Sequence, residues 1–176
     1  MKVLIFVLGG TRSGKTKYAL NYGENLFHFS NFFYIATAEP VDEEMKARIK
    51  EHQASRSDKW QLIEEPIKLW EVLDKIPDSS VAIIDCLTVW LGNLMNYQMD
   101  VKKCCELFLN SLKKFVSSTE HCMICVANEV GLGVVPETKM GRDFRDIAGK
   151  LNQDVAELSD EVYFLVAGCP LKLKAI

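Results

Sequence analysis

The stretch Gly9-Gly10-Thr11-Arg12-Ser13-Gly14-Lys15-Thr16 decides the fold, because it matches the phosphate-loop pattern G-x-x-x-x-G-K-[ST] at every fixed position. An apolar run rich in β-forming residues, 3–8, precedes it, and a helix-compatible segment, 15–26, follows it. In this pattern backbone N–H groups curl around phosphate oxygens, the lysine reaches the β- and γ-phosphates, and the threonine hydroxyl serves Mg²⁺. A glycine-rich turn that matches by chance is the alternative, but the strand–loop–helix context favours a nucleoside triphosphate site.

Length, composition and charge narrow the class of protein without identifying the reaction. The 176 residues suit one nucleotide-binding catalytic domain, residues 1–176. The formal net charge of −3 provides no basic footprint for nucleic acid. The apolar residues, 48% of the chain, form strand-length runs too short to span a membrane, and the first run begins without a signal peptide. We therefore expect a cytoplasmic protein; kinases, GTPases, transporter ATPases and nucleotidyltransferases all remain open.

Strand-like and helix-like segments alternate along the chain. Continuous apolar runs predict strands buried on both faces, and the segments between them suit helices. The predicted strands are residues 3–8, 32–37, 81–85, 123–128 and 161–166, and the predicted helices are residues 15–26, 42–54, 67–74, 87–97, 101–117 and 141–160. This alternation predicts an α/β fold with a mostly parallel central sheet flanked by helices. Ligands bind such sheets at the carboxyl ends of the strands.

Asp85 closes the predicted strand 81–85 in the manner of a Walker B acid. Its carboxylate can hold Mg²⁺, directly or through water, next to the hydroxyl of Thr16. The alternative is a helix N-cap for the segment that begins near Leu87, since aspartate suits that position as well. With the phosphate loop present, we favour a metal site formed by Thr16 and Asp85.

A predicted helix over residues 42–54 carries His52 on its apolar face, and Arg48 and Arg56 lie four residues to either side. The two like charges should lower the pKa of the imidazole and leave a neutral nucleophile at pH 7. Arginines bind phosphate oxygens bidentately, so this trio suits a phosphate ligand. An incidental surface histidine is the alternative, and composition alone favours it.

Three other segments carry alternatives. Glu64-Glu65-Pro66 is either a solvated turn or a segment that recognises guanine. One carboxylate can accept hydrogen bonds from both N1–H and N2–H of guanine. The N-K-x-D signature by which GTPases recognise guanine is absent from the chain, so another group would have to recognise the base. Asn128 and Glu129 end a predicted strand on the ligand side, which suggests contact with a substrate or a metal. Cys122 and Cys125 have metal or redox spacing, but they lie in a predicted buried strand without a second pair, which favours core thiols.

Together these segments resemble the bifunctional adenosylcobinamide kinase/adenosylcobinamide-phosphate guanylyltransferase family of cobalamin biosynthesis, nearly from end to end. The phosphate loop is common to many families, whereas the spacing of His52, Arg56 and Trp60 is specific, as are the blocks at 128–131 and 144–146. The other matching positions are Tyr34-Ile35-Ala36-Thr37-Ala38, Asp42 to Met45, Arg48-Ile49, Glu64-Glu65-Pro66, Asp85-Cys86-Leu87-Thr88, Asn93-Leu94, Gly133, Pro136, Arg142, Gly149, Asn152 and Gly168.

The resemblance implies a RecA-like P-loop fold, a homotrimer and two reactions. In the first reaction, the γ-phosphate of ATP or GTP moves to the hydroxyl of the aminopropanol arm of adenosylcobinamide. In the second, GMP moves from GTP to the resulting phosphate, which gives adenosylcobinamide-GDP and pyrophosphate. The family runs this second step through a guanylylated histidine, and His52 matches its position. The resemblance therefore favours the nucleophile over the incidental histidine.

The resemblance also implies roles around GTP. Besides the phosphate loop, the implied nucleotide-binding residues are Ala36, Thr37, Ala38, Arg48, Gln53, Ala54, Ser55, Arg56, Glu64 and Asp85, with Glu64 a candidate reader of the base. His52 would attack the α-phosphorus, while Lys15 and Mg²⁺ would stabilise the departing pyrophosphate. Ser57 stands where the family usually has proline, and we expect this change to loosen the exit from the histidine helix.

Two other functions compete with this interpretation. A P-loop small-molecule kinase in which His52 is structural would transfer the γ-phosphate only. A nucleotide-dependent switch that hydrolyses GTP slowly is a third possibility, but the absent N-K-x-D signature argues against a GTPase of the usual kind.

Overall fold

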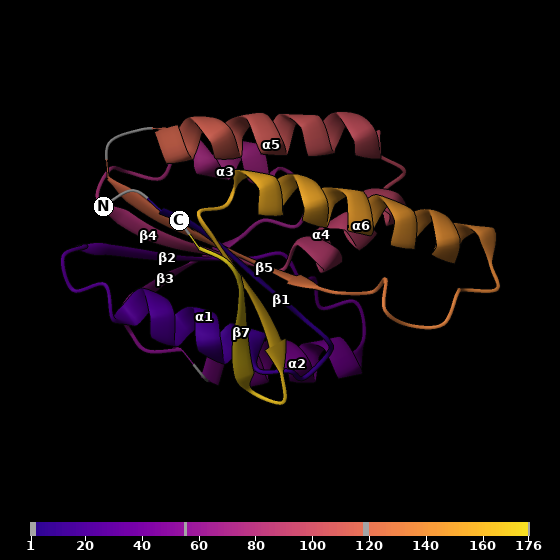
Figure 1. Cartoon of the computed structure of the whole chain (residues 1–176), viewed down its shortest axis with the longest axis horizontal. Helices are drawn as coiled ribbons and strands as arrows, with labels where there is room; N and C mark the ends of the chain where they lie inside the picture. The colour runs from indigo at the N-terminus through magenta and orange to yellow at the C-terminus, as the bar shows by residue number, and fades with distance from the viewer. Residues whose placement is uncertain (1–2, 55, 118–119, 176) are drawn as a thin grey trace.

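The computed structural model describes residues 3–54, 56–117 and 120–175, which form a seven-stranded sheet with helices on both faces (Figure 1). The strands within these residues are β1 (Val3–Gly9), β2 (Asn31–Ala36), β3 (Trp60–Glu64), β4 (Ser80–Asp85), β5 (His121–Asn128), β6 (Glu161–Val166) and β7 (Cys169–Lys174). The helices are α1 (Lys15–Glu24), α2 (Glu43–Ala54), α3 (Leu69–Leu73), α4 (Leu87–Asn96), α5 (Val101–Ser117) and α6 (Lys139–Leu158).

The strand order is β3-β2-β4-β5-β1-β6-β7, and every neighbouring pair is parallel except β6 and β7. Helices α3, α4, α5 and α6 cover one face, and α1 and α2 lie on the other (Figure 1). β1 lies inside the sheet between β5 and β6, and the phosphate loop follows it directly. The loop therefore lies at the carboxyl edge, where parallel sheets bind ligands.

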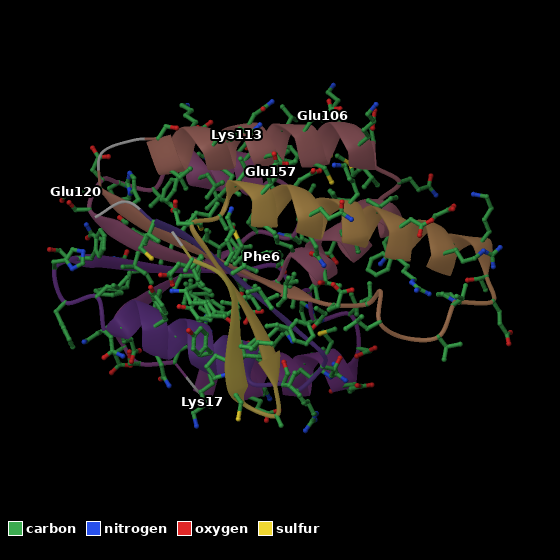
Figure 2. All side chains as sticks on the ribbon, in the orientation of Figure 1. Phe6, Lys17, Glu106, Lys113, Glu120 and Glu157 are labelled. Carbon is green, nitrogen blue, oxygen red and sulfur yellow. The ribbon has the colours of Figure 1, made fainter. Side chains whose placement is uncertain are left out.

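Alternate residues of the central strands enter two different cores. From β1, Leu4 and Phe6 pack beneath α3 to α6, whereas Ile5 and Val7 pack on the side of α1. Figure 2 shows Phe6 in the middle of the molecule, while Lys113 lies on α5, where it is exposed. Burial on both faces explains why these strands read as continuous apolar runs.

The predicted α/β architecture is confirmed, but the strands β3 and β7 were not predicted. β3 is an edge strand in which only Trp60 is buried, and every residue of β7 is exposed. Neither segment contains the continuous apolar run that marks the other strands, because each buries little surface. Helix α3 is also shorter than expected, and α6 begins at Lys139, where Thr138 caps it by accepting from Gly141 N.

The cysteines behave as core thiols rather than as a metal or redox pair. Cys122 and Cys125 are fully buried in β5, and all six cysteines are free. Burial raises the pKa of the Cys122 thiol to about 12, which suppresses the reactive thiolate. None of the helices in the described residues is long and apolar enough to cross a membrane.

Candidate active site

The phosphate loop, residues 9–16, connects β1 to α1 in a shape that requires glycine at two positions. A Cβ at Gly9 would lie 2.5 Å from the carbonyl oxygen of Leu165. Gly14, the N-cap of α1, has a φ of +94°, and a Cβ there would lie 3.3 Å from Gly168 Cα. The β6–β7 hairpin therefore leaves no room for a side chain at Gly9, and at Gly14 the positive φ and the close hairpin together favour glycine.

Lys15 lies inside the loop with 7% of its surface exposed. Its Nζ donates to Gly10 O at 2.6 Å and to Ser13 Oγ at 3.5 Å. Burial lowers the pKa of the ammonium, and the nearby Cys86 and Asp85 oppose that shift. A cation held by neutral oxygens in a buried loop favours an anionic ligand, as the motif predicts.

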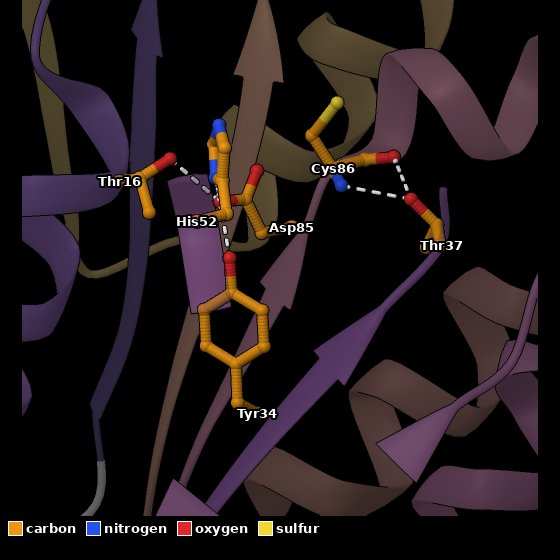
Figure 3. A network of polar contacts seen from close by, with 6 residues as sticks. All are labelled: Thr16, Tyr34, Thr37, His52, Asp85 and Cys86. Atoms are coloured by element: carbon orange, nitrogen blue, oxygen red, sulfur yellow. Dashed lines mark hydrogen bonds and ion pairs between the residues drawn. The ribbon is translucent and has the colours of Figure 1, made fainter. Parts of the chain in front are cut away.

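One carboxylate oxygen of Asp85 gathers side chains from three other segments (Figure 3). Oδ2 accepts from Thr16 Oγ1 at 2.6 Å and from Tyr34 Oη at 2.7 Å, and His52 Nδ1 lies 3.7 Å away. Burial raises the pKa of Asp85, but His52, Thr16 and Tyr34 together outweigh burial and lower it. Asp85 is therefore an ionised group beside the phosphate loop.

The capping alternative for Asp85 is wrong. Helix α4 begins at Leu87 and its N-cap is Cys86, without a side-chain capping bond. Asp85 still belongs to β4, which directs its carboxylate toward Thr16 instead.

Thr16 and Asp85 present the hard oxygen ligands that Mg²⁺ prefers, so the donor set fits this metal. Within the described residues no group of three or more His, Cys, Asp and Glu side chains could hold a metal ion. Mg²⁺ at this position would therefore depend on phosphate oxygens and water for most of its octahedral ligands, as is usual for nucleotide-bound magnesium.

The predicted shift of the His52 pKa is wrong in direction, although Arg56 does lower this pKa as expected. The Asp85 carboxylate, 3.7 Å from Nδ1, raises the pKa of His52, and it outweighs burial and Arg56, both of which lower it. Arg48 contributes little, because it pairs with Glu44 at 2.6 Å on the exposed surface of α2. Since Nδ1 is the nitrogen nearest Asp85, the carboxylate favours a proton on Nδ1 and leaves Nε2 as the nucleophilic atom.

Arg56 lies against Tyr34 at the wall of the site. Its guanidinium carbon is 4.4 Å from the centroid of the Tyr34 ring. Its Nη1 is buried and has no hydrogen-bond partner among the described residues. Burial raises the pKa of Tyr34, which keeps its hydroxyl a donor at neutral pH. An unsatisfied buried guanidinium N–H is a suitable donor for a phosphate oxygen.

These side chains line a cavity of about 460 Å³, a volume that suits a nucleotide. The predicted site residues on its wall are Thr11, Arg12, Ser13, Gly14, Lys15, Thr16, Ala36, Ala38, Arg48, His52, Gln53, Arg56, Glu64 and Asp85. Gly9, Gly10, Thr37 and Ala54 are not part of the wall, and Ser55 lies outside the described residues.

Thr37 does not line the cavity but makes hydrogen bonds to the backbone next to it. Its Oγ1 donates to Cys86 O at 2.9 Å and accepts from Cys86 N at 2.8 Å (Figure 3). These bonds join the end of β2 to the residue that follows Asp85. Thr37 therefore braces the backbone beside the carboxylate.

Glu64 and Glu65, ambiguous in the sequence, have different environments. Glu65 Oε1 accepts from Ile67 N at 2.8 Å and from Lys68 N at 2.7 Å, so the turn interpretation applies to it. Glu64 ends β3 and lines the cavity as an exposed residue. Of the pair, Glu64 is the one that a nucleotide base could reach.

Several cavity residues had no assigned role in the nucleotide site. They are Lys17, Tyr34, Met45, Ile49, Glu51, Leu62, Cys86, Val89 and Asn128. Asn128 had been expected to contact a substrate or metal, and it lines the cavity, whereas Glu129 turns back to accept from Gly131 N at 2.6 Å. Met45 and Ile49 share a helix face with His52, and that spacing was the available signal for them.

Ser57 forms a tether that proline could not form. Its Oγ donates to Glu24 Oε1 at 2.6 Å, and the same oxygen accepts from Trp60 Nε1 at 2.9 Å. Glu24 is the last residue of α1, the helix that begins in the phosphate loop. The exit from the histidine helix is thus bound to α1, which runs against the expected loosening.

We expect Glu24→Ala to lower the free energy of unfolding by about 1–3 kcal/mol, because it leaves the N–H of the buried Trp60 indole without its acceptor. Ser57→Ala should cost less than about 1 kcal/mol, since it removes one exposed bond. Urea denaturation of the two variants measures the difference, and equal costs would contradict the assignment of Glu24 as the anchor of both residues.

A phosphate loop at the carboxyl edge of a parallel sheet, with an acidic strand end beside its threonine, defines a P-loop nucleotide-binding enzyme. Residues 5–173 match the family model described as Cobinamide kinase / cobinamide phosphate guanyltransferase, and the chain belongs to this family. It is accordingly an adenosylcobinamide kinase and adenosylcobinamide-phosphate guanylyltransferase of cobalamin biosynthesis.

The similarity to relatives runs over nearly the whole chain. The chain is 34% identical over 189 residues to the bifunctional adenosylcobalamin biosynthesis protein CobU of Escherichia coli (strain K12), with 98% of this chain and 100% of that protein covered. It is 39% identical over 171 residues to the bifunctional adenosylcobalamin biosynthesis protein CobP of Pseudomonas aeruginosa, with 96% and 95% covered.

Solved structures of low sequence identity share the fold. The ATPase domain of G40P superposes with a TM-score of 0.51 at 13% identity, over 93% of this chain and 69% of that chain. The flagellar accessory protein FlaH from Methanocaldococcus jannaschii gives 0.54 at 14% identity, over 98% and 78%. The RecA-like P-loop fold implied by the family resemblance is therefore confirmed.

Proposed function

We propose that this chain carries out the guanylyl transfer of its family with His52 as the covalent carrier of GMP. The observation that carries the proposal is the shared oxygen of Asp85, which bonds Thr16 of the phosphate loop at 2.6 Å and has His52 Nδ1 3.7 Å away. A histidine beside the phosphate loop supports an attack on phosphorus, because the reacting groups would then lie close together. One catalytic domain, residues 1–176, would carry both activities.

The triphosphate of GTP or ATP would bind along the phosphate loop. Lys15 would exchange its bond to Gly10 O for the β- and γ-phosphate oxygens, a stronger charge-assisted contact. Thr16 and Asp85 would hold Mg²⁺, which supplies neutralising charge to the same oxygens. The unsatisfied Nη1 of Arg56 would donate to the α-phosphate.

In the kinase reaction, the hydroxyl oxygen of the adenosylcobinamide arm bonds to the γ-phosphorus as the bond to the β–γ bridging oxygen breaks. The hydroxyl proton passes to solvent water, and a nucleoside diphosphate remains. Lys15 offsets the charge that develops on the bridging oxygen. His52 takes no covalent part in this reaction.

In the guanylyl transfer, His52 Nε2 bonds to the α-phosphorus of GTP as the bond to the α–β bridging oxygen breaks and pyrophosphate leaves. The ionised Asp85 at Nδ1 offsets the positive charge that grows on the imidazole. A phosphate oxygen of adenosylcobinamide phosphate then bonds to the same phosphorus and displaces the imidazole. His52 is restored, and adenosylcobinamide-GDP is released.

The proposal is tested by incubating the protein with Mg²⁺ and GTP labelled at the α-phosphate, followed by denaturation. Label that stays on the chain, is lost in acid and survives base identifies a phosphoramidate. Chase with adenosylcobinamide phosphate should then move the label to the corrinoid. A chain that forms adenosylcobinamide-GDP and never holds label would contradict the covalent route through His52. Light scattering of the same sample tests the homotrimer, which we also propose on the family resemblance.

We further propose that Glu64 reads guanine, because it ends β3 as an exposed residue at the cavity wall. Glu64→Ala is expected to raise the KM for GTP about tenfold, a typical loss for one charged hydrogen-bonding partner, and to leave the KM for ATP unchanged. Steady-state kinetics with both nucleotides measure this. Glu65→Gln is the control, and an equal rise for ATP and GTP would contradict base recognition.

A further inference from the structure

Tyr34 occupies a position in the site for which the two reactions provide no chemical step. It lies in β2 with 3% of its surface exposed, and it lines the cavity. Its hydroxyl donates to Asp85 Oδ2 at 2.7 Å (Figure 3), and its ring lies 4.4 Å from the guanidinium carbon of Arg56. One side chain therefore contacts both the carboxylate and the arginine.

The two contacts use different parts of the tyrosine. The hydroxyl reaches the oxygen that also serves Thr16, so it limits the rotation of Asp85. The ring face holds Arg56 by a cation–π contact, which gains strength where water is excluded. Because Nη1 of Arg56 has no hydrogen-bond partner among the described residues, the ring is a principal support of that guanidinium.

We propose that Tyr34 is a positioning residue that holds Asp85 through its hydroxyl and Arg56 through its ring. This inference rests on the proposed function, in which Asp85 helps to hold Mg²⁺ in both reactions and Arg56 donates to the α-phosphate. Loss of the hydroxyl should therefore weaken both reactions, whereas loss of the ring should add a defect in guanylyl transfer alone. The two parts of one side chain can be removed separately.

Tyr34→Phe removes the hydroxyl and keeps the ring. We expect the kcat of both reactions to fall about tenfold, a typical effect of one hydrogen bond to a charged group, with little change in the KM for adenosylcobinamide. Tyr34→Leu removes the ring as well, and guanylyl transfer should fall about a further tenfold. Arg56→Ala should then reduce the rate of guanylyl transfer by a smaller factor in the Tyr34→Leu variant than in wild type, because the two changes remove the same contact.

A second readout does not depend on turnover. Calorimetry measures the affinity for an α,β-methylene analogue of GTP, which His52 cannot cleave, with and without Mg²⁺. Tyr34→Phe should reduce the gain in affinity that Mg²⁺ supplies and leave the metal-free affinity unchanged. Tyr34→Leu should weaken the metal-free affinity too. Urea denaturation of each variant shows whether the fold is retained.

Tyr163→Phe is the matched control. Its hydroxyl donates to Glu161 Oε2 at 2.6 Å, a bond of the same chemistry between residues of β6 that do not line the cavity. Neither reaction and neither affinity should change in this variant.

The inference is overturned if Tyr34→Phe matches wild type, or if Tyr34→Leu weakens both reactions equally relative to Tyr34→Phe. Failure of the proposed function has a different signature, since wild-type protein would then hold no label from α-labelled GTP. The calorimetric comparison remains decisive for Tyr34 in that case.

Discussion

His52→Ala should hold no label from α-labelled GTP, with guanylyl transfer reduced by about 10⁶-fold, the order seen when a covalent nucleophile is removed. Cobinamide phosphorylation should survive, because Lys15, Thr16 and Asp85 remain in place. The fold should also survive, since the His52 side chain is 47% exposed on a helix whose described residues include no buried side chain. We expect a change in unfolding free energy below about 0.5 kcal/mol.

His28→Ala provides the control for this experiment. His28 is exposed and contacts the Phe29 ring in a tilted arrangement at a centroid distance of 4.3 Å, and it does not line the cavity. Its replacement should leave both activities and the label unchanged. Full labelling of His52→Ala would assign the covalent site to another residue and leave His52 with a structural role.

Lys15→Met should lower kcat/KM for both reactions by about 10³-fold, because the cation that contacts the transferred phosphates is lost. Unlike most core substitutions, it should not destabilise the protein. Lys15 is buried, and burial lowers its pKa, so an apolar side chain of similar length removes a desolvation cost. The free energy of unfolding should stay the same or rise by about 1 kcal/mol.

The control is Lys113→Met, which removes a charge from the exposed surface of α5 (Figure 2). It should leave activity and stability unchanged. A strong loss of stability in Lys15→Met would show that its bond to Gly10 O is structural, and the assignment to the phosphates would then need revision.

Much of the fold could be predicted, because the central strands bury both faces and leave a continuous apolar signature. β1, β4 and β5 have this pattern, and all three were predicted. The edge strands β3 and β7 bury little and pair through backbone hydrogen bonds, which leave little trace in side-chain pattern. These two strands were not predicted because their side chains are mostly exposed.

Most residues of the candidate site could be predicted from the sequence, whereas the contacts between them could not. Asp85 and His52 were expected near the nucleotide, and both line the cavity. The protonation of His52 was misjudged, because the prediction weighed the arginines that lie close in sequence and could not weigh Asp85, which lies 33 residues away. Tyr34 was overlooked as a site residue for the same reason, since its partner Asp85 is on a neighbouring strand.

The sequence by itself determined the phosphate loop, the parallel sheet and the family, because these depend on consecutive residues, on the period of apolar side chains and on ordered motifs. The tertiary structure alone decided which atoms meet. Thr16, Tyr34 and His52 reach a single oxygen of Asp85 only when the ends of β1, β2 and β4 meet at one sheet edge and α2 lies over them. The strength of a hydrogen bond or a charge interaction depends on the distance between two groups in space, and not on their separation along the chain.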